Sequence, residues 1–240
     1  MKAVILAGGL GSRLAPFTQI IPKPLLPIGE KAVLELQILN LARHGVSDIF
    51  IATNYMADYV EAFLGDGSKY NVRLHFSRED KPLGTCGPIT LLKEYLDDLF
   101  LLMNGDILTT FDFTAGAKFA RELNVDLTVV TKELITPFHF GRVLGEGPYV
   151  EGVQEKPDIV FEILAGIYFM RPSVFEVVPT GVAYGMDTLI KDCLAQKRQI
   201  GKFRCNEYWL DIGQLHDYQT AQKVYDKHFK YLSKPALCSE

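Results

Sequence analysis

The sequence lacks the features that mark several classes of protein. Its four cysteines form no CxxC pair and have no histidine partner at zinc spacing, so reduced thiols are expected rather than a zinc site or a disulfide framework. Its 25 basic residues do not outnumber its 29 acidic ones, which argues against general nucleic-acid binding. The N-terminal apolar run, from Ala3 to Ala7, is too short for a signal peptide or a membrane span. We therefore expect a cytoplasmic protein without nucleic-acid or membrane partners.

What is present is the composition of a folded domain, with 48% hydrophobic and 22% charged residues in 240. Short apolar runs at 3–7, 48–52 and 99–103 are typical of strands buried on both faces, and 72–76 alternates like a strand. Helices are predicted at 31–44, where apolar residues recur at helical spacing, and at 57–64 and 88–96. This alternation predicts an α/β fold with a doubly wound, mostly parallel, Rossmann-like sheet.

The second half of the chain has a different pattern. Strands are predicted at 125–131, 141–146, 149–155, 160–170 and 201–204, and helices at 172–178, 186–196 and 214–230. Glycine and proline turns between the first of these strands favour antiparallel pairing. We expect this half to form a smaller mixed lobe over the carboxyl edge of the sheet, where open α/β sheets bind ligands.

A glycine-rich segment directly follows the first predicted strand and reads GGLGSR from Gly8 to Arg13. Glycines allow backbone N–H groups to approach an anion closely, although a tight turn without a ligand remains the alternative. Leu14 replaces the third glycine of a dinucleotide loop, and no P-loop pattern is present. Lys23 follows between two prolines, which stiffen its backbone. Arg13 and Lys23 could together neutralise a triphosphate.

Two acids lie at the ends of predicted strands. Asp106 follows the apolar run at 99–103, and Asp211 precedes the last helix. Magnesium prefers oxygen ligands and takes one or two carboxylates together with phosphate oxygens, so the two acids predict a Mg²⁺ site. Alternatively, Asp211 caps the helix and Asp106 closes a turn.

The opening segment resembles the nucleotidyl transferase family that activates sugar 1-phosphates. The family pattern GGxGxRLxPxTxxxPKPxxPI is met at every fixed position from Gly8 to Ile28, and the NGD and WxDxG motifs that carry the family's magnesium aspartates are intact at Asp106 and Asp211. The resemblance implies that the glycine loop wraps the nucleotide phosphates, that Arg13 neutralises the leaving pyrophosphate and that Lys23 contacts the reacting phosphates. The expected nucleotide-binding residues are Leu6, Ala7, Gly8, Gly9, Gly11, Ser12, Glu79, Pro82, Gly84, Thr85, Asn104 and Gly105.

The resemblance also implies a sugar side. Lys156, in an EKP motif, would hold the sugar 1-phosphate, and Glu155 a sugar hydroxyl, although the residues alone also fit a solvated turn. Gly141 and Ala165 lie in further motifs of that side. Leu164 replaces an asparagine that relatives place near a mannose hydroxyl, and an apolar side chain makes no such hydrogen bond, which argues against mannose.

Glu79 lies where thymidylyl- and uridylyl-transferring relatives usually carry glutamine. A carboxylate only accepts hydrogen bonds, and guanine presents two adjacent donors, so Glu79 favours GTP and the guanylyl-transferring branch. A surface acid is the alternative. The implied reaction transfers GMP from GTP to a sugar 1-phosphate and releases pyrophosphate; UTP, CTP or dTTP are alternative donors.

The resemblance places one nucleotidyltransferase domain at 1–230, with a nucleotide-binding half at 1–130, a sugar-phosphate-binding lobe and C-terminal helix at 131–230, and a tail at 231–240. Two other classes of protein are disfavoured. A regulatory protein that binds sugar nucleotides without catalysis should have lost a phosphate-binding basic residue or a magnesium acid, and this chain retains Arg13, Lys23, Asp106, Lys156 and Asp211. A nicotinamide dehydrogenase should keep the third glycine of the dinucleotide loop, which is missing here. The hexapeptide repeats of some relatives are absent here, which removes one route to trimers and leaves a homodimer possible.

Overall fold

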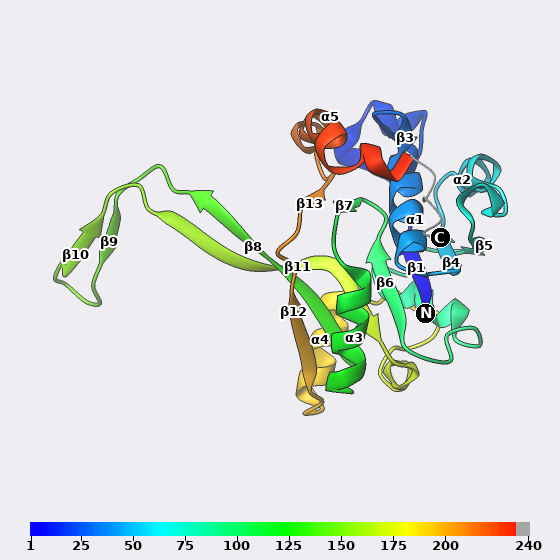
Figure 1. The fold of residues 1–240 in the computed structure, drawn as a ribbon. Helices are drawn as coiled ribbons and strands as arrows, with labels where there is room; N and C mark the ends of the chain where they lie inside the picture. The colour runs from blue at the N-terminus through cyan, green and yellow to red at the C-terminus, as the bar shows by residue number, and fades with distance from the viewer. Residues whose placement is uncertain (234–240) are drawn as a thin grey trace, which may run out of the picture.

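A seven-stranded sheet forms the centre of the computed structural model, which describes residues 1–233 (Figure 1). The strand order is β12-β8-β11-β6-β1-β4-β5, and every neighbouring pair is parallel except the two that involve β11. The strands are β1 (Lys2–Leu6), β4 (Asp48–Thr53), β5 (Arg73–Arg78), β6 (Phe100–Asn104), β8 (Leu127–Pro137), β11 (Asp158–Met170) and β12 (Ile200–Arg204). The predicted α/β class with a mostly parallel sheet is confirmed.

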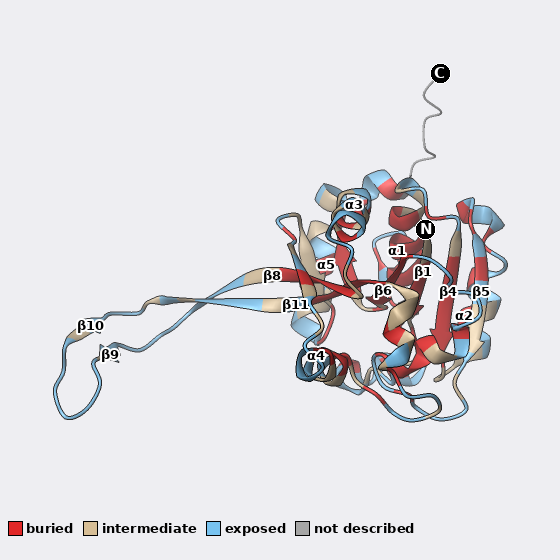
Figure 2. Cartoon of the chain, turned by 90° about the horizontal axis from the view of Figure 1, so that it is seen from below, coloured by how far each residue is buried: buried red, intermediate tan, exposed pale blue. Residues whose placement is uncertain are grey.

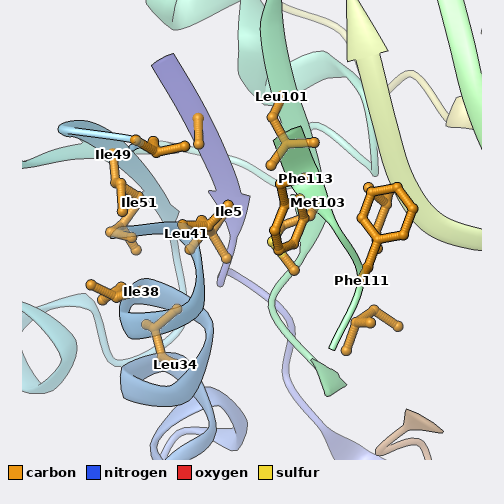
Figure 3. Packing of buried hydrophobic residues seen from close by; sticks show 14 of the residues in the cluster. Ile5, Leu34, Ile38, Leu41, Ile49, Ile51, Leu101, Met103, Phe111 and Phe113 are labelled. Atoms are coloured by element: carbon orange, nitrogen blue, oxygen red, sulfur yellow. The ribbon is translucent and has the colours of Figure 1, made fainter. Parts of the chain in front are cut away.

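Both faces of this sheet are covered, which explains why its strands read as continuous apolar runs. In β1, Ala3 and Ile5 belong to one buried cluster, and Val4 between them belongs to another on the opposite face. The first cluster includes Leu34 and Ile38 of α1, which pack against the sheet in Figure 3. The helices are α1 (Val33–Arg43), α2 (Ala57–Leu64), α3 (Phe113–Leu123), α4 (Met186–Ala195) and α5 (Leu215–His228).

A third buried cluster lies beside the sheet and holds the C-terminal helix in place. Tyr225 of α5 packs there with Ile28, and Leu232, at 2% exposure, closes the cluster. Three small antiparallel pairs complete the fold. They are β2 (Pro27–Ile28) with β3 (Lys31–Ala32), β7 (Ile107–Thr109) with β13 (Trp209–Asp211), and β9 (Arg142–Leu144) with β10 (Gly152–Gln154).

Two segments predicted as helices are 3-10 turns instead, at Gly87–Leu92 and Pro172–Glu176. The first is anchored by a distant part of the chain, because the N–H groups of Cys86 and Gly87 both donate to the carbonyl of Tyr184. Conversely, α3 was not predicted, although its start carries a recognisable signal. The Asp112 side chain accepts hydrogen bonds from two backbone N–H groups of the first turn at 2.9 Å, which is a standard N-cap.

The second half of the chain does not stand apart from the first. β8, β11 and β12 complete the same sheet, and the part that leaves the body is a long hairpin formed by the outer ends of β8 and β11 with β9 and β10 (Figure 1). Of the expected tail, residues 234–240, which include Cys238, lie outside the described residues. The three described cysteines are buried and free. None of the helices within residues 1–233 combines the length and hydrophobicity needed to cross a bilayer.

Candidate functional site

One cavity of about 530 Å³ opens at the carboxyl ends of β1 and β6, a size typical of small-molecule sites. It lies where the strands of an open α/β sheet end, which is where such folds bind ligands. Its walls are formed by Leu6, Ala7, Gly8, Gly9, Leu10, Gly11, Ser12, Arg13, Lys23, Pro24, Asn54, Glu79, Pro82, Gly84, Thr85, Asn104, Gly105, Asp106 and Gly213. We call this space the main cavity. Every residue predicted for the nucleotide side lines it.

The glycine-rich segment curls tightly at Gly11, which adopts a left-handed conformation with φ of 62°. A Cβ at this position would lie 2.9 Å from side-chain atoms of both Lys23 and Thr18. The Thr18 hydroxyl also donates a hydrogen bond of 2.9 Å to the Gly11 carbonyl. The segment is therefore folded against the residues that lead into the Pro-Lys-Pro motif, and both line one wall of the main cavity.

Gly105 allows the ends of β6 and β1 to approach closely. Its N–H donates to the Leu6 carbonyl at 2.8 Å, and a Cβ would lie only 2.4 Å from that oxygen. Asp106 follows immediately, so the close approach aims its carboxylate at the main cavity. Lys23, whose side chain is 12% exposed, forms an ion pair with that carboxylate.

Asp106 and Asp211 are neighbours in space although 105 positions separate them in the sequence. Asp211 lies opposite Ile107 in the β7–β13 pair, and the N–H of Ile212 donates to the Asp106 carbonyl at 2.9 Å. Burial, and then the charge of Asp106, raises the pKa of Asp211 to about 6, against the lowering effect of Lys23 and Arg13. The two acids therefore repel each other beside two cations.

The Oδ1 atom of Asp211 is buried and has no hydrogen-bond partner. An orphaned carboxylate oxygen next to a second carboxylate is a suitable position for a divalent cation, since Mg²⁺ takes one or two protein carboxylates and completes its shell with phosphate and water oxygens. Among the described residues, no group of three or more potential ligands from histidine, cysteine, aspartate and glutamate is found. The donor set fits an ion that the substrate helps to coordinate.

Glu79 directly follows β5, lines the main cavity and lies next to Gly8 of the glycine-rich segment. Its Oε2 accepts a hydrogen bond of 2.7 Å from the N–H of Leu83, and its Oε1 would lie 3.0 Å from a Cβ at Gly8. Burial raises the pKa of Glu79, although the Leu83 hydrogen bond opposes this. One carboxylate oxygen thus holds the loop at 80–85, and the other remains available beside Gly8.

The residues predicted for the sugar side do not reach the main cavity of their own chain. Gly141, Glu155 and Lys156 lie on the long hairpin, where the Lys156 side chain is 68% exposed and has Glu155 as an ion-pair partner at 4.0 Å. Ala165 is buried in β11, and its carbonyl accepts a hydrogen bond from the Trp209 indole at 2.8 Å. Within one chain, the structure therefore gathers the expected nucleotide residues and leaves the expected sugar residues outside.

Four residues of the main cavity were missed by sequence reasoning, namely Leu10, Pro24, Asn54 and Gly213. Asn54 had a usable signal, because it directly follows a buried strand at the ligand-binding edge; its amide donates to the Glu79 carbonyl at 3.0 Å. Leu10, Pro24 and Gly213 lie inside the recognised motifs. The motifs either allow any residue at these positions or give the residue no role in binding.

Comparison with known proteins gives a consistent picture. The model of the family described as "Nucleotidyl transferase" matches residues 2–228. The mannose-1-phosphate guanyltransferase of Schizosaccharomyces pombe is 34% identical over 237 residues, covering 94% of this chain and 64% of that protein. The chain thus spans less than two thirds of the length of this relative.

Two solved structures share the fold. HddC from Yersinia pseudotuberculosis, solved in complex with GMP-PN, has a TM-score of 0.74 and 27% identity, covering 93% of this chain and 99% of that one. A Bacillus anthracis protein named as a glucose-1-phosphate thymidylyltransferase, solved with a sucrose, has a TM-score of 0.77 and 25% identity, covering 95% and 96%.

Proposed function

The chain belongs to the nucleotidyl transferase family, and on this premise we propose that it transfers GMP from GTP to a sugar 1-phosphate and releases pyrophosphate. The observation that carries the proposal is the main cavity, whose lining includes the glycine segment, Arg13, Lys23 and Asp106. Asp211 is not one of the lining residues, but the β7–β13 pair holds it beside Asp106. Relatives named for GMP transfer and a neighbour solved with GMP-PN support the guanine nucleotide.

The chemistry needs charge neutralisation more than proton transfer. A sugar 1-phosphate is already an anionic nucleophile, so the obstacle is the repulsion between two phosphates that must approach in line. Arg13 offers a planar fork for the departing pyrophosphate, and Lys23 lies at the cavity wall to hold the reacting phosphates. Because Lys23 already contacts Asp106, its charge is positioned before substrate binds, which is the preorganisation that electrostatic catalysis requires.

Asp106 and Asp211 would hold a Mg²⁺ ion. When bound, the ion would supply further positive charge at the phosphates. The support from this chain is the buried, unpartnered oxygen of Asp211 and the raised pKa of its carboxyl group, both of which report negative charge without sufficient compensation from the protein.

Base selection would fall to Glu79. Its Oε2 is engaged by the Leu83 N–H, which fixes the carboxylate plane and leaves Oε1 toward the cavity. Each carboxylate oxygen can accept two hydrogen bonds, so Oε1 and the remaining lone pair of Oε2 would accept the two adjacent donors of guanine. The carboxylate has no donor for a pyrimidine carbonyl. Desolvation of this acid is offset when the guanine donors bind it, which gives GTP an advantage over UTP, CTP and dTTP.

The proposal is tested by pyrophosphate release from GTP, UTP, CTP and dTTP in turn, each with hexose, aminohexose and heptose 1-phosphates and Mg²⁺. GTP should be used fastest, and Glu79→Gln should narrow its lead over the pyrimidine nucleotides by about tenfold or more, the scale of one hydrogen bond to a charged group. Glu155→Gln, on the hairpin, is the matched control and should leave base preference unchanged. A pyrimidine preference in the wild type contradicts the role of Glu79, and no release with any pair contradicts the proposed activity.

A further inference from the structure

The long hairpin extends away from the body of the protein, as Figures 1 and 2 show from two directions. It comprises residues 133–163, which we call the arm. Its two strands are paired from Glu162 opposite Glu133 out to Asp158 opposite Pro137, and β9 pairs with β10 at its far end. An isolated two-stranded ribbon is at best marginally stable in water, so the arm needs a surface to cover it.

The arm is apolar as well as isolated. Figure 2 shows it exposed along nearly its whole length, and six of its large apolar residues keep between 61% and 80% of their surface accessible. They are Ile135, Phe140, Val143, Tyr149, Val150 and Val153. Two of them, Val143 and Val153, lie opposite each other in the β9–β10 pair. Large exposed apolar residues gathered on one projecting element are typical of an interaction site.

The arm's base directs it away from the main cavity of its own chain. Lys202 of β12 donates to Glu162 at 2.8 Å, and Arg204 of the same strand forms an ion pair with Glu133. Together with the continuous β8–β11 ladder, these contacts hold the first residues of the arm in the plane of the sheet. Lys156 lies eight residues beyond Leu164, about 26 Å along an extended strand.

The body also carries exposed apolar residues in the stretch of chain that contains the glycine segment and Lys23. Leu10, which lines the cavity, is 64% exposed, and Ile20, between the glycine segment and Lys23, is 74% exposed. Phe17 and Ile21 are also exposed in this stretch. These exposed apolar residues, which are close in sequence to Arg13 and Lys23 of the main cavity, are complementary in character to the apolar residues of the arm.

We propose that two copies of this chain exchange arms, so that the arm of each lies over the main cavity of the other. The main cavity of one subunit is then completed by Lys156 and Glu155 of the partner subunit. Such an exchange is two-fold symmetric and buries the same surfaces on both copies. The occupant is a second copy, because the arm carries the very residues that the main cavity lacks. This inference rests on the proposed function for the roles of Lys156 and Glu155, and on the arm's geometry alone for the dimer.

Mixed dimers test the exchange directly. Asp106→Ala and Lys156→Ala chains are coexpressed with different affinity tags, and the mixed dimer is purified on both tags in turn. Each homodimer should lose about 10²-fold or more in pyrophosphate release. The mixed dimer should recover about half of the wild-type rate, because one of its two symmetric sites then combines an intact body with an intact arm. An arm that served its own chain would leave both sites of the mixed dimer defective.

The matched control pairs two body residues. A mixed dimer of Asp106→Ala and Asp211→Ala chains should stay as inactive as its homodimers, because neither body is intact whichever arm covers it. Recovery there would mean that the rate reports something other than arm exchange. No recovery in the Asp106→Ala and Lys156→Ala dimer, or the absence of any dimer to purify, overturns the proposal.

A measurement without activity separates this inference from the proposed function. Light scattering on the wild-type protein should give the mass of a dimer, and the triple variant Phe140→Ser, Val143→Thr, Val150→Thr should give a monomer whose circular dichroism matches the wild type. A monomeric wild type, or a variant that remains dimeric, refutes the exchange. A dimer that responds in this way but turns over no nucleotide refutes the function and leaves the arm exchange standing.

Discussion

Replacing Asp211 by asparagine should stabilise the metal-free protein while it abolishes activity. Burial and the neighbouring Asp106 raise the pKa of Asp211 from 3.8 to about 6, so the folded state disfavours the charged form. Because the folded pKa lies above the unfolded value, this carboxyl supports folding fully below about pH 4 and loses that contribution as the pH rises through 6. Above pH 6, the wild type is therefore the less stable protein.

The magnitude follows from the shift. About two pKa units correspond to about 3 kcal/mol, and partial solvent screening of a half-buried group reduces this to roughly 1–2 kcal/mol. For a chain of this size, Asp211→Asn should therefore raise the melting temperature at pH 7.5 by roughly 2–8 °C. The difference should close between pH 6 and pH 4, where the wild-type carboxyl becomes neutral.

Differential scanning calorimetry in EDTA across pH 4–8 measures this difference. Adding Mg²⁺ at pH 7.5 should raise the melting temperature of the wild type more than that of Asp211→Asn, because only the wild type retains both carboxylates. A variant that melts at or below the wild-type temperature at pH 7.5 in EDTA would show that the two acids do not repel each other as the structure implies. An equal response of both proteins to Mg²⁺ would remove Asp211 from the metal site.

Three further predictions concern other residues of the site. Asp106→Ala should lower kcat/KM by about 10²–10³-fold, the scale of losing a preorganised electrostatic group, and steady-state pyrophosphate release would show this; a loss under threefold would contradict the assignment. Lys156→Ala should lower turnover and weaken sugar 1-phosphate binding. Calorimetric titration should nevertheless find a GTP affinity within about twofold of wild type, because the proposed contact of Lys156 is with the sugar phosphate and not with the nucleotide. Gly105→Ala should cost about 2–4 kcal/mol in urea unfolding because its Cβ would lie 2.4 Å from the Leu6 carbonyl, whereas Gly9→Ala, with no atom within 4 Å, should unfold like the wild type.

Local chemistry made much of the protein predictable from its sequence. The alternation of Ala3, Val4 and Ile5 between two buried clusters is the consequence of a strand covered on both faces, and the apolar run reports it directly. The predicted helix at 57–64 coincides with α2. The glycine segment and the Pro-Lys-Pro motif were identifiable because their backbone requirements restrict which residues can occupy them.

Pairings between distant segments were not predictable in the same way. The proximity of Asp106 to Asp211 depends on the β7–β13 pair. Each of those strands is three residues long, too short to carry a periodic signal. The 3-10 turn at 87–92 is decided by hydrogen bonds to Tyr184. In these cases a tertiary partner, which no local pattern encodes, determined the backbone.

The arm shows the same division most clearly. The sequence by itself predicted strands at 141–146, 149–155 and 160–170 and placed Lys156 between a glutamate and a proline. It did not predict that β8 continues beyond 131 to Pro137. Only the tertiary structure decided the direction in which those strands extend. The pairing of β11 with β8 and the ion pairs to β12 set this direction, because the residues of the ribbon are themselves compatible with many directions. Secondary structure depends on neighbours in the chain, whereas direction in space depends on contacts that form only when the sheet is assembled.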